Sequence, residues 1–364
     1  MRLVARLVAD ADKHQHNDVR HEVAQRVDGV GSHGGTMPHD AGHKLEEQQR
    51  HIHHAAHQRH LVYLSTPFLH SVYFLRAKVI NNPDNSYLCT QKEFVGQPEL
   101  LFYQFDEGVT AFSTTRQGGC SEGRYGEFNI NRYCGDSEEA IRQNRSLLCR
   151  LLGIGDDRLI MPHQVHLTEM AVVDDAFLQL PDDERLARLE GVDALMTDVA
   201  GVCIGVSTAD CIPVLLYDPV CRAVCAVHAG WRGTVQRIVA KAVAKMTAVY
   251  GTRPADLVAQ IGPGIHLDSF EVGDEVYDAF SHEGFPMESI SKKYPVNSLF
   301  TSKWHIDLPE CNRQQLLSAG VPGERITVSP ICTYQQSDRF FSARRLGINS
   351  GRIFTGIVIT SKKQ

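Results

Sequence analysis

Three short apolar runs near the middle of the chain limit the possible folds more than any other feature. They are residues 202–206, 212–217 and 223–227, and they are rich in Val, Ile, Leu and Cys. Each run is followed by turn-forming or polar residues. Short apolar runs bounded in this way are typical of buried β-strands. The sequence therefore predicts three strands in the interior of the protein.

Polar side chains stand at the ends of these predicted strands. Ser-Thr-Ala-Asp-Cys follows the first run at 207–211, and His-Ala-Gly-Trp-Arg-Gly follows the third at 228–233. An unpaired polar group beside a buried strand costs several kcal/mol, so a core alone does not explain these residues. Because loops at the ends of rigid elements often carry function, we expect the functional site here.

The pattern after residue 100 predicts a mixture of strands and helices that do not alternate strictly. The helix that ends near residue 152 begins at Ser137, whose hydroxyl can cap it. Such an order favours an α+β fold, with mixed sheets covered by helices, over a doubly wound sheet. The other predicted strands are residues 101–105, 109–114, 170–173, 193–197, 257–264, 326–328 and 353–359. The other predicted helices are residues 234–250, 275–280 and 307–319. Residues 174–190 are predicted to be a loop or short helix, and residues 281–303 to be irregular.

The first part of the chain has a different composition. Twelve of the 18 His lie between His14 and His70, and the tract at 50–60 has no usable apolar face. His-rich tracts can bind metal, but most are simply low-complexity sequence. We therefore divide the chain into a low-complexity segment, residues 1–97, and a globular domain, residues 98–364. The first segment is expected to be disordered, or to result from a start codon placed too far upstream.

Composition excludes several classes of protein. The net charge is −6, and no long basic run follows residue 95, which argues against nucleic acid as a partner. No apolar stretch approaches the roughly 20 residues of a membrane span. None of the ten Cys forms a CxxC pair, and several lie within apolar runs. We therefore expect a reducing, cytoplasmic setting.

Three side chains from separate segments could hold a metal: His166, Cys211 and His228. Zinc binds His nitrogen and Cys thiolate, and a catalytic zinc site needs three protein ligands and an open position. Spacing alone is a weak signal, because a lone His or Cys is more often structural. A second interpretation makes Cys211 a nucleophile and His228 its base. A copper oxidase is a third possibility, because soft Cys and His ligands also accept copper.

Several arginines could bind an anion. Arg116 lies beside Gly118 and Gly119, Arg232 precedes Gly233, and Arg344 follows two phenylalanines. Backbone amides of glycines and arginine side chains together make good phosphate sites. For Arg344 and its neighbour Arg345, a surface position without function is the alternative.

A set of short motifs, which occur in a fixed order along the chain, resembles the YfiH/laccase-domain family. Its members are described as multifunctional purine nucleoside phosphorylases, with an older label of polyphenol oxidase. The first 95 residues lie outside the resemblance, and Leu167 stands where members usually have Gly. The matching motifs are Thr115–Gly119, Asn144-Arg145, Gln164-Val165-His166, Ser207-Thr208-Ala209-Asp210-Cys211, His228-Ala229-Gly230-Trp231-Arg232-Gly233, Ile261–Ile265, Phe270–Gly273, Cys332-Thr333 and Phe340–Arg345.

The resemblance implies one α/β/β/α domain, similar to the catalytic domain of cytotoxic necrotizing factor. It implies zinc held by His166, Cys211 and His228, with copper as the alternative metal. The implied reactions are phosphorolysis of adenosine, inosine, guanosine and methylthioadenosine, and deamination of adenosine. The expected partners are therefore purine nucleosides and phosphate, and the protein is expected to be a monomer or a homodimer.

Within that resemblance we assign roles to the polar residues of the motifs. Asp210 is the candidate acid–base group, with steering of His228 as the alternative role. The arginines are expected to orient phosphate and stabilise a ribosyl cation. The catalytic residues are thus Asp210, Arg232 and Cys211, and the substrate-binding residues are Arg116, Asn129, Gln164 and Arg344.

Overall fold

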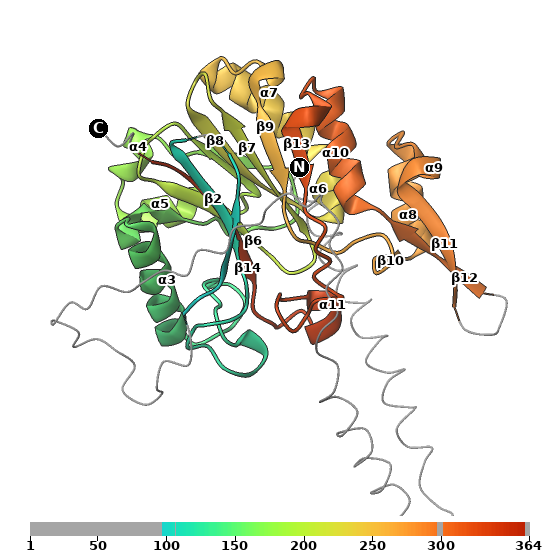
Figure 1. Ribbon diagram of the computed structural model, residues 1–364, viewed down its shortest axis with the longest axis horizontal. Helices are drawn as coiled ribbons and strands as arrows, with labels where there is room; N and C mark the ends of the chain where they lie inside the picture. The colour runs from blue at the N-terminus through green and yellow to red at the C-terminus, as the bar shows by residue number, and fades with distance from the viewer. Residues whose placement is uncertain (1–96, 106, 297–300, 361–364) are drawn as a thin grey trace, which may run out of the picture. The chain divides into compact units, whose positions relative to one another are not determined.

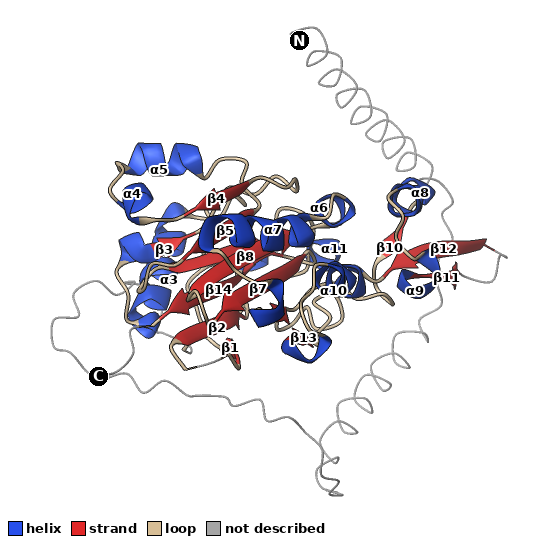
Figure 2. Ribbon diagram, turned by 90° about the horizontal axis from the view of Figure 1, so that it is seen from above, coloured by secondary structure: helices blue, strands red, loops and turns tan. Residues whose placement is uncertain are grey.

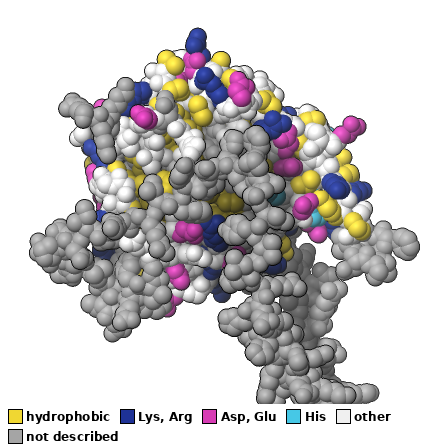
Figure 3. Space-filling model, in the orientation of Figure 1, with side chains coloured by type: hydrophobic (Ala, Val, Ile, Leu, Met, Phe, Trp, Pro, Cys, Tyr) yellow, Lys and Arg dark blue, Asp and Glu magenta, His cyan; other side chains and the backbone are white. Residues whose placement is uncertain are grey.

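The structure is a computed structural model that describes residues 97–105, 107–296 and 301–360. The prediction for residues 1–97 therefore lies outside the described residues, except for Gln97. In the part of the chain that the structure covers, every helix is too short or too polar to cross a membrane. On the face shown in Figure 3, basic and acidic side chains are interspersed.

A five-stranded sheet forms the first layer of strands. Its order is β1-β2-β14-β6-β3, and all neighbours are antiparallel except β3 and β6. The chain-terminal strand β14 thus lies in the middle of the sheet, beside the first of the three apolar runs. The strands are β1 (Leu100–Tyr103), β2 (Val109–Thr114), β3 (Leu159–Ile160), β6 (Cys203–Thr208) and β14 (Ile353–Ile359).

A six-stranded sheet forms the second layer and contains the other two apolar runs. Its order is β13-β9-β7-β8-β5-β4, with parallel pairs at both edges and antiparallel pairs between them. The strands β7 and β8 are buried along their whole length. The strands are β4 (Met170–Val172), β5 (Ala194–Thr197), β7 (Ile212–Asp218), β8 (Ala223–Ala229), β9 (Val258–Ile261) and β13 (Ile326–Val328).

The two sheets pack face to face because alternate residues of each strand point to opposite sides. On β6, Ile204 and Val206 join the core between the sheets, whereas Cys203 packs on the outer face. On β8, Val224 and Ala226 join the same inner core. His228 continues this inner row, so its ring points to the end of the space between the sheets.

Helices cover the outer faces of both sheets and complete the predicted α/β/β/α order (Figures 1 and 2). Ser137 caps α3 as expected, accepting a hydrogen bond from the N–H of Ala140, and α3 packs on the first sheet. The second sheet is covered by α7 and α10. The helices are α3 (Glu138–Leu152), α4 (Asp175–Leu178), α5 (Asp182–Arg188), α6 (Trp231–Val235), α7 (Ile238–Tyr250), α8 (Asp274–His282), α9 (Met287–Ile290), α10 (Leu308–Ser318) and α11 (Ala343–Leu346), with single 3₁₀ turns at Gly123–Tyr125, Asp156–Arg158, Pro254–Asp256 and Gly323–Arg325.

Two local predictions were wrong. The helix predicted over residues 234–250 is broken between α6 and α7, because Arg237 has a left-handed backbone with φ 62°. Its guanidinium lies 3.7 Å from the centroid of the Phe285 ring and donates to the carbonyl of Glu283, which fixes the break. Residues 281–303 were expected to be irregular, but they contain α9, the strand β11 (Ser291–Val296) and the start of β12 (Thr301–Ile306). These two strands form a three-stranded sheet with β10 (Glu271–Val272), in the order β10-β12-β11.

Candidate metal centre and substrate cavity

The three predicted metal ligands converge at one end of the space between the sheets. His166 lies in the loop after β3, Cys211 joins β6 to β7, and His228 lies near the end of β8. One potential ligand atom from each residue lies within 4.8 Å of the other two. The ring centroids of the two histidines are 4.7 Å apart, and the rings are inclined at 74°.

Backbone geometry at the site is specialised so that these side chains can meet. His166 has φ 64° and Asp210 has φ 89°, a region that residues other than glycine seldom adopt. Gly230 is needed for a different reason: a Cβ there would lie 3.0 Å from Cδ2 of His166 and 3.1 Å from Sγ of Cys211. Strained backbone of this kind persists only where surrounding contacts hold it.

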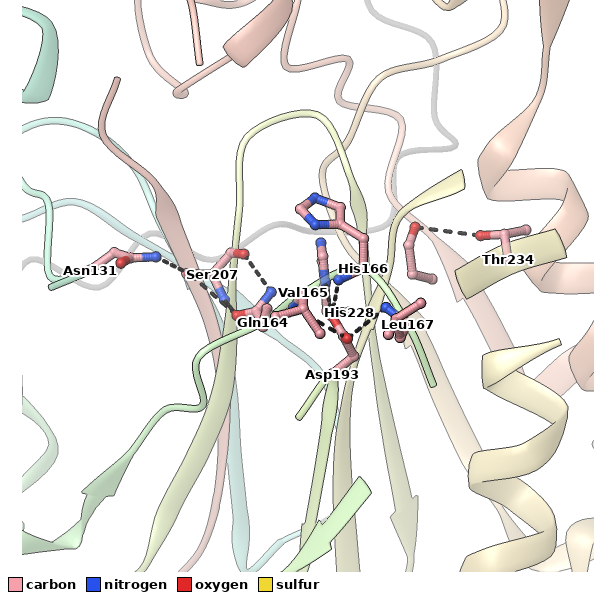
Figure 4. Close-up of polar contacts among 10 residues, drawn as sticks. Asn131, Gln164, Val165, His166, Leu167, Asp193, Ser207, His228 and Thr234 are labelled. Carbon is pink, nitrogen blue, oxygen red and sulfur yellow. Dashed lines mark hydrogen bonds and ion pairs between the residues drawn. The ribbon is translucent and has the colours of Figure 1, made fainter. Parts of the chain in front are cut away.

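The buried carboxylate of Asp193 supplies those contacts (Figure 4). Its Oδ1 accepts from Nδ1 of His228 at 2.7 Å and from the backbone N–H of His166 at 3.0 Å. Its Oδ2 accepts from the N–H groups of Leu167 at 2.7 Å and Val165 at 3.4 Å. One side chain therefore orients the imidazole of one potential ligand and the backbone of another. Sequence reasoning did not identify Asp193, which it placed at the start of a strand.

The charges at the site favour a thiolate and a positively charged imidazole. Burial alone would raise the pKa of Cys211, but the charge of His228 and hydrogen bonds from His166 and His228 outweigh it and lower the pKa to about 6. Burial would lower the pKa of His228, but Cys211 and Asp193 raise it to about 9. The pKa of Asp193 is lowered despite burial, because His228 and two backbone N–H groups bind the carboxylate.

This donor set fits a single soft divalent cation. Zinc takes imidazole nitrogen at about 2.0 Å and thiolate sulfur at about 2.3 Å, so its ligand atoms lie about 3–4 Å apart. The three potential ligand atoms all lie within 4.8 Å of one another, which is close to those values. A carboxylate behind a ligating histidine is a common outer partner in such sites. Among the described residues, one group of three or more His, Cys, Asp or Glu side chains has this arrangement.

A cavity of about 580 Å³ opens above the three residues. Gln164, Asp210 and Arg344 line it, together with the potential metal ligands. Gln164 is held rigidly: its Nε2 donates to the carbonyl of Ser207 at 2.9 Å, and its Oε1 accepts from the N–H of Ser207 at 2.8 Å. A cavity of this size is in the range of small-molecule sites.

Asp210 does not steer His228, so that alternative role was wrong. Its Oδ1 accepts from the hydroxyl of Thr333 and its Oδ2 from the backbone N–H of Arg344, both at 2.7 Å. The carboxylate therefore ties the C-terminal segment to the floor of the cavity. The residue that orients His228 is Asp193.

The structure does not bring three of the predicted residues to the cavity. Arg116 donates to the carbonyls of Gly126 and Ser337, and Arg232 lies over the ring of Trp231, with 4.4 Å to the centroid. Asn129 is buried, and its amide binds Asp136 and the N–H of Arg352. These side chains are used in holding loops together or packing on a neighbouring ring.

Several residues that sequence reasoning did not select also line the cavity, among them His163 and Arg352. Arg352 follows Gly351 and donates to carbonyls of its own loop, including that of Ile348 at 2.7 Å. His163 directly precedes the Gln-Val-His motif. That position next to a predicted metal ligand motif is the sequence feature that could have identified it.

Comparison with protein families gives a match over residues 110–360 to the family described as multi-copper polyphenol oxidoreductase laccase. A purine nucleoside phosphorylase from Bacteroides thetaiotaomicron is 47% identical over 268 residues, which cover 74% of this chain and 97% of the relative. A protein named adenosine deaminase RL5, from an unknown prokaryotic organism, is 46% identical over 259 residues, covering 71% of this chain and 97% of that protein.

Solved structures show the same architecture. The structure of the hypothetical protein YfiH from Bacillus licheniformis superposes with a TM-score of 0.66 at 30% identity, covering 74% of this chain and 98% of that one. The structure of YlmD from Geobacillus stearothermophilus superposes with a TM-score of 0.63 at 32% identity, covering 70% of this chain and 93% of that one. The layered α+β fold is therefore shared with these proteins.

Proposed function

Because this chain belongs to the YfiH/laccase-domain family, we propose that its globular domain is a zinc-dependent purine nucleoside phosphorylase that also deaminates adenosine. The proposed nucleosides are adenosine, inosine, guanosine and methylthioadenosine. The names of the two relatives near 47% identity support both reactions. The observation that carries the proposal is the convergence of His166, Cys211 and His228 below the cavity.

His166, Cys211 and His228 would hold the zinc. Asp193, which lies behind them, would orient the imidazole of His228 and the backbone of His166. When bound, zinc supplies Lewis acidity at neutral pH. The cavity above leaves room for a nucleoside on the open side of the three ligands. Gln164 stands at this floor with its amide fixed by Ser207, and we assign it to hydrogen bonding with the nucleoside.

Phosphate is proposed to bind between Arg344 and Arg352, which both line the cavity. Among the described residues, neither guanidinium has a carboxylate within ion-pairing distance. Their hydrogen bonds go to uncharged acceptors: Arg344 donates to the carbonyl of Glu271, and Arg352 donates to carbonyls such as that of Ile348 and to the hydroxyl of Ser350. Positive charge without a local counter-ion favours an oxyanion. Arg344 thus keeps its predicted role, whereas Arg116 and Arg232 lie outside the cavity lining.

Asp210 remains our candidate for proton transfer in deamination. Two donors hold its carboxylate at the cavity floor. An Asp210→Asn protein that keeps its zinc but does not release ammonia from adenosine would support this role. Loss of zinc from the same variant would instead assign Asp210 to the scaffold.

A second candidate function follows from the lowered pKa of Cys211. A thiolate beside His228 could act as a nucleophile, as in Cys/His hydrolases and deamidases. Zinc and nucleophile compete for the same sulfur. Stoichiometric zinc that is lost in Cys211→Ala supports the phosphorylase, whereas a metal-free active protein that iodoacetamide inactivates supports the hydrolase.

The copper oxidase that the family description suggests would need additional ligands for a multi-copper cluster. Within the described ranges one His–Cys–His group is present. Oxidation of phenols by copper-loaded protein, with no cleavage of nucleosides, would favour this third function.

The first experiment is phosphate-dependent release of hypoxanthine from inosine by the purified full-length protein. We expect release with phosphate and none without it. Release that does not depend on phosphate would indicate a hydrolase and contradict the proposal. The setting is proposed to be reducing and cytoplasmic, which the nine free cysteines of the described residues support. For the assembly, our proposal remains a monomer or a homodimer.

A further inference from the structure

One histidine that lines the cavity, His163, has no role in the reaction proposed above. Nδ1 of His163 donates to the carboxylate of Glu190, with its two oxygens at 2.7 and 2.9 Å. The backbones are also joined, because the N–H of His163 donates to the carbonyl of Leu189 and the N–H of Gly191 donates to that of His163. The two residues are therefore held as a unit.

The imidazole of His163 is also fixed in orientation. It stacks on the ring of Tyr133, with centroids 4.2 Å apart and planes inclined at 20°, and Tyr133 lines the same cavity. A carboxylate at Nδ1 sets the tautomer and leaves Nε2 as the nitrogen that can give or take a proton. The carboxylate of Glu190 thus fixes the ring through Nδ1, in the position that the aspartate holds in a serine protease triad.

Other ionisable groups at the cavity have existing partners. Asp210 accepts from Thr333 and Arg344, and His166, Cys211 and His228 form the potential metal set. Phosphorolysis also requires a proton donor, because a purine leaves its sugar more easily after protonation at N7. His163 is the imidazole outside the metal set that the described cavity wall offers for this purpose.

We propose that His163, oriented by Glu190, is the general acid that protonates the purine leaving group; this rests on the proposed phosphorylase function. An oxygen of hydrogen phosphate forms a bond to C1′ of the ribose as the C1′–N9 bond breaks. The electron pair of that bond goes to the purine, and the proton of Nε2 goes to N7. The proton of the phosphate then restores the imidazolium, so the products are the free purine and ribose 1-phosphate.

The test uses a substrate that does not need the proton. In 7-methylinosine the methyl group already places positive charge on the base, which can leave without protonation. General acid catalysis contributes about 10²–10⁴-fold. For His163→Gln in the full-length protein, we expect kcat for inosine to fall by about 10²-fold. For 7-methylinosine we expect little change. Glu190→Gln should show a smaller loss with the same selectivity.

His282→Gln is the matched control, since His282 is exposed at the end of α8, and it should leave both rates unchanged. Zinc content should be the same in all variants. Equal losses for both nucleosides in His163→Gln, or no loss for either, would overturn the assignment of His163 alone. A wild-type protein that cleaves neither nucleoside would overturn the proposed function and this assignment together.

Discussion

The floor and the wall of the cavity are built in opposite ways. The floor is formed by His166, Cys211 and His228, of which His228 is 2% exposed. Asp193 is fully buried behind it, and four hydrogen bonds to its carboxylate fix the arrangement. On the wall, Tyr133 is 37% exposed, and its partner His163 is bonded to a carboxylate that faces solvent. The floor at His228 and Asp193 is buried and held rigidly, whereas the wall is open to solvent. We therefore expect changes in the floor to weaken binding of the proposed metal and changes in the wall to alter the handling of substrate.

The largest effect is expected from Cys211→Ala. This change removes the sulfur of the proposed metal set, so turnover of every nucleoside should fall by more than about 10³-fold. Such a fall is larger than the loss of activity that follows removal of a single oxyanion-hole donor. Zinc content after dialysis against chelator and the rate of inosine cleavage measure it. Cys221→Ala, at a free cysteine in the turn between β7 and β8, is the control. Full activity in Cys211→Ala would contradict the account of the floor.

Asp193→Asn should have the next largest effect. An amide nitrogen cannot accept the hydrogen bonds that one of the two oxygens now receives, so His166 or His228 loses its support. Loss of an outer partner typically costs about 10–100-fold in metal affinity or activity. Competition with a chromophoric chelator measures the affinity. Asp198→Asn, at an exposed carboxylate just after β5, should leave it unchanged.

A smaller effect is expected from Gly230→Ala. The added Cβ would approach His166 and Cys211 to 3.0 and 3.1 Å, so the floor must spread. Overpacking of this kind costs about 1–3 kcal/mol. The free energy of unfolding of the metal-free protein gives the cost directly. In Gly323→Ala the new Cβ meets Leu317 at 3.5 Å, an ordinary contact, and the stability should be nearly unchanged. Equal stabilities of the two variants would show that the floor is not tightly packed.

Two of the three arginines predicted to bind phosphate, Arg344 and Arg232, should differ from each other. Arg344 lines the cavity, and its replacement by Ala should raise the KM for phosphate by about 10-fold, the scale of one charge-assisted hydrogen bond. Arg232 does not line the cavity and only packs on the ring of Trp231, which does, so Arg232→Ala should have the smallest effect of all. Initial rates at varied phosphate concentration compare them. The reverse order of effects would place phosphate elsewhere.

The sequence predicted the parts of the fold that local patterns specify. The apolar runs became β6, β7 and β8, and Ser137 capped α3, because burial and capping are encoded in adjacent residues. The strands β11 and β12 were not predicted. Their residues include Lys293 and Pro295, and they are held by cross-strand contacts such as that of Lys293 with the Trp304 ring, which no local pattern shows.

The site was predicted only in part for a similar reason. His, Cys and Arg stand out in a sequence because few structural roles require them at strand ends. Asp193 does not, since an aspartate before a strand resembles a turn residue until three separate backbone N–H groups are seen to meet it. Arg116 was wrongly expected at the cavity because a glycine-rich neighbourhood resembles an anion site. In the structure its guanidinium binds the carbonyls of Gly126 and Ser337.

X-ray absorption at the zinc edge tests the central claim most directly. The purified full-length protein should contain zinc with one sulfur neighbour at about 2.3 Å and nitrogen neighbours at about 2.0 Å. The sulfur signal should disappear in Cys211→Ala. The sulfur also distinguishes this site from zinc bound to the twelve His that precede residue 71, which would give a shell of nitrogen and oxygen. A spectrum without sulfur, or one that Cys211→Ala leaves unchanged, would contradict the account.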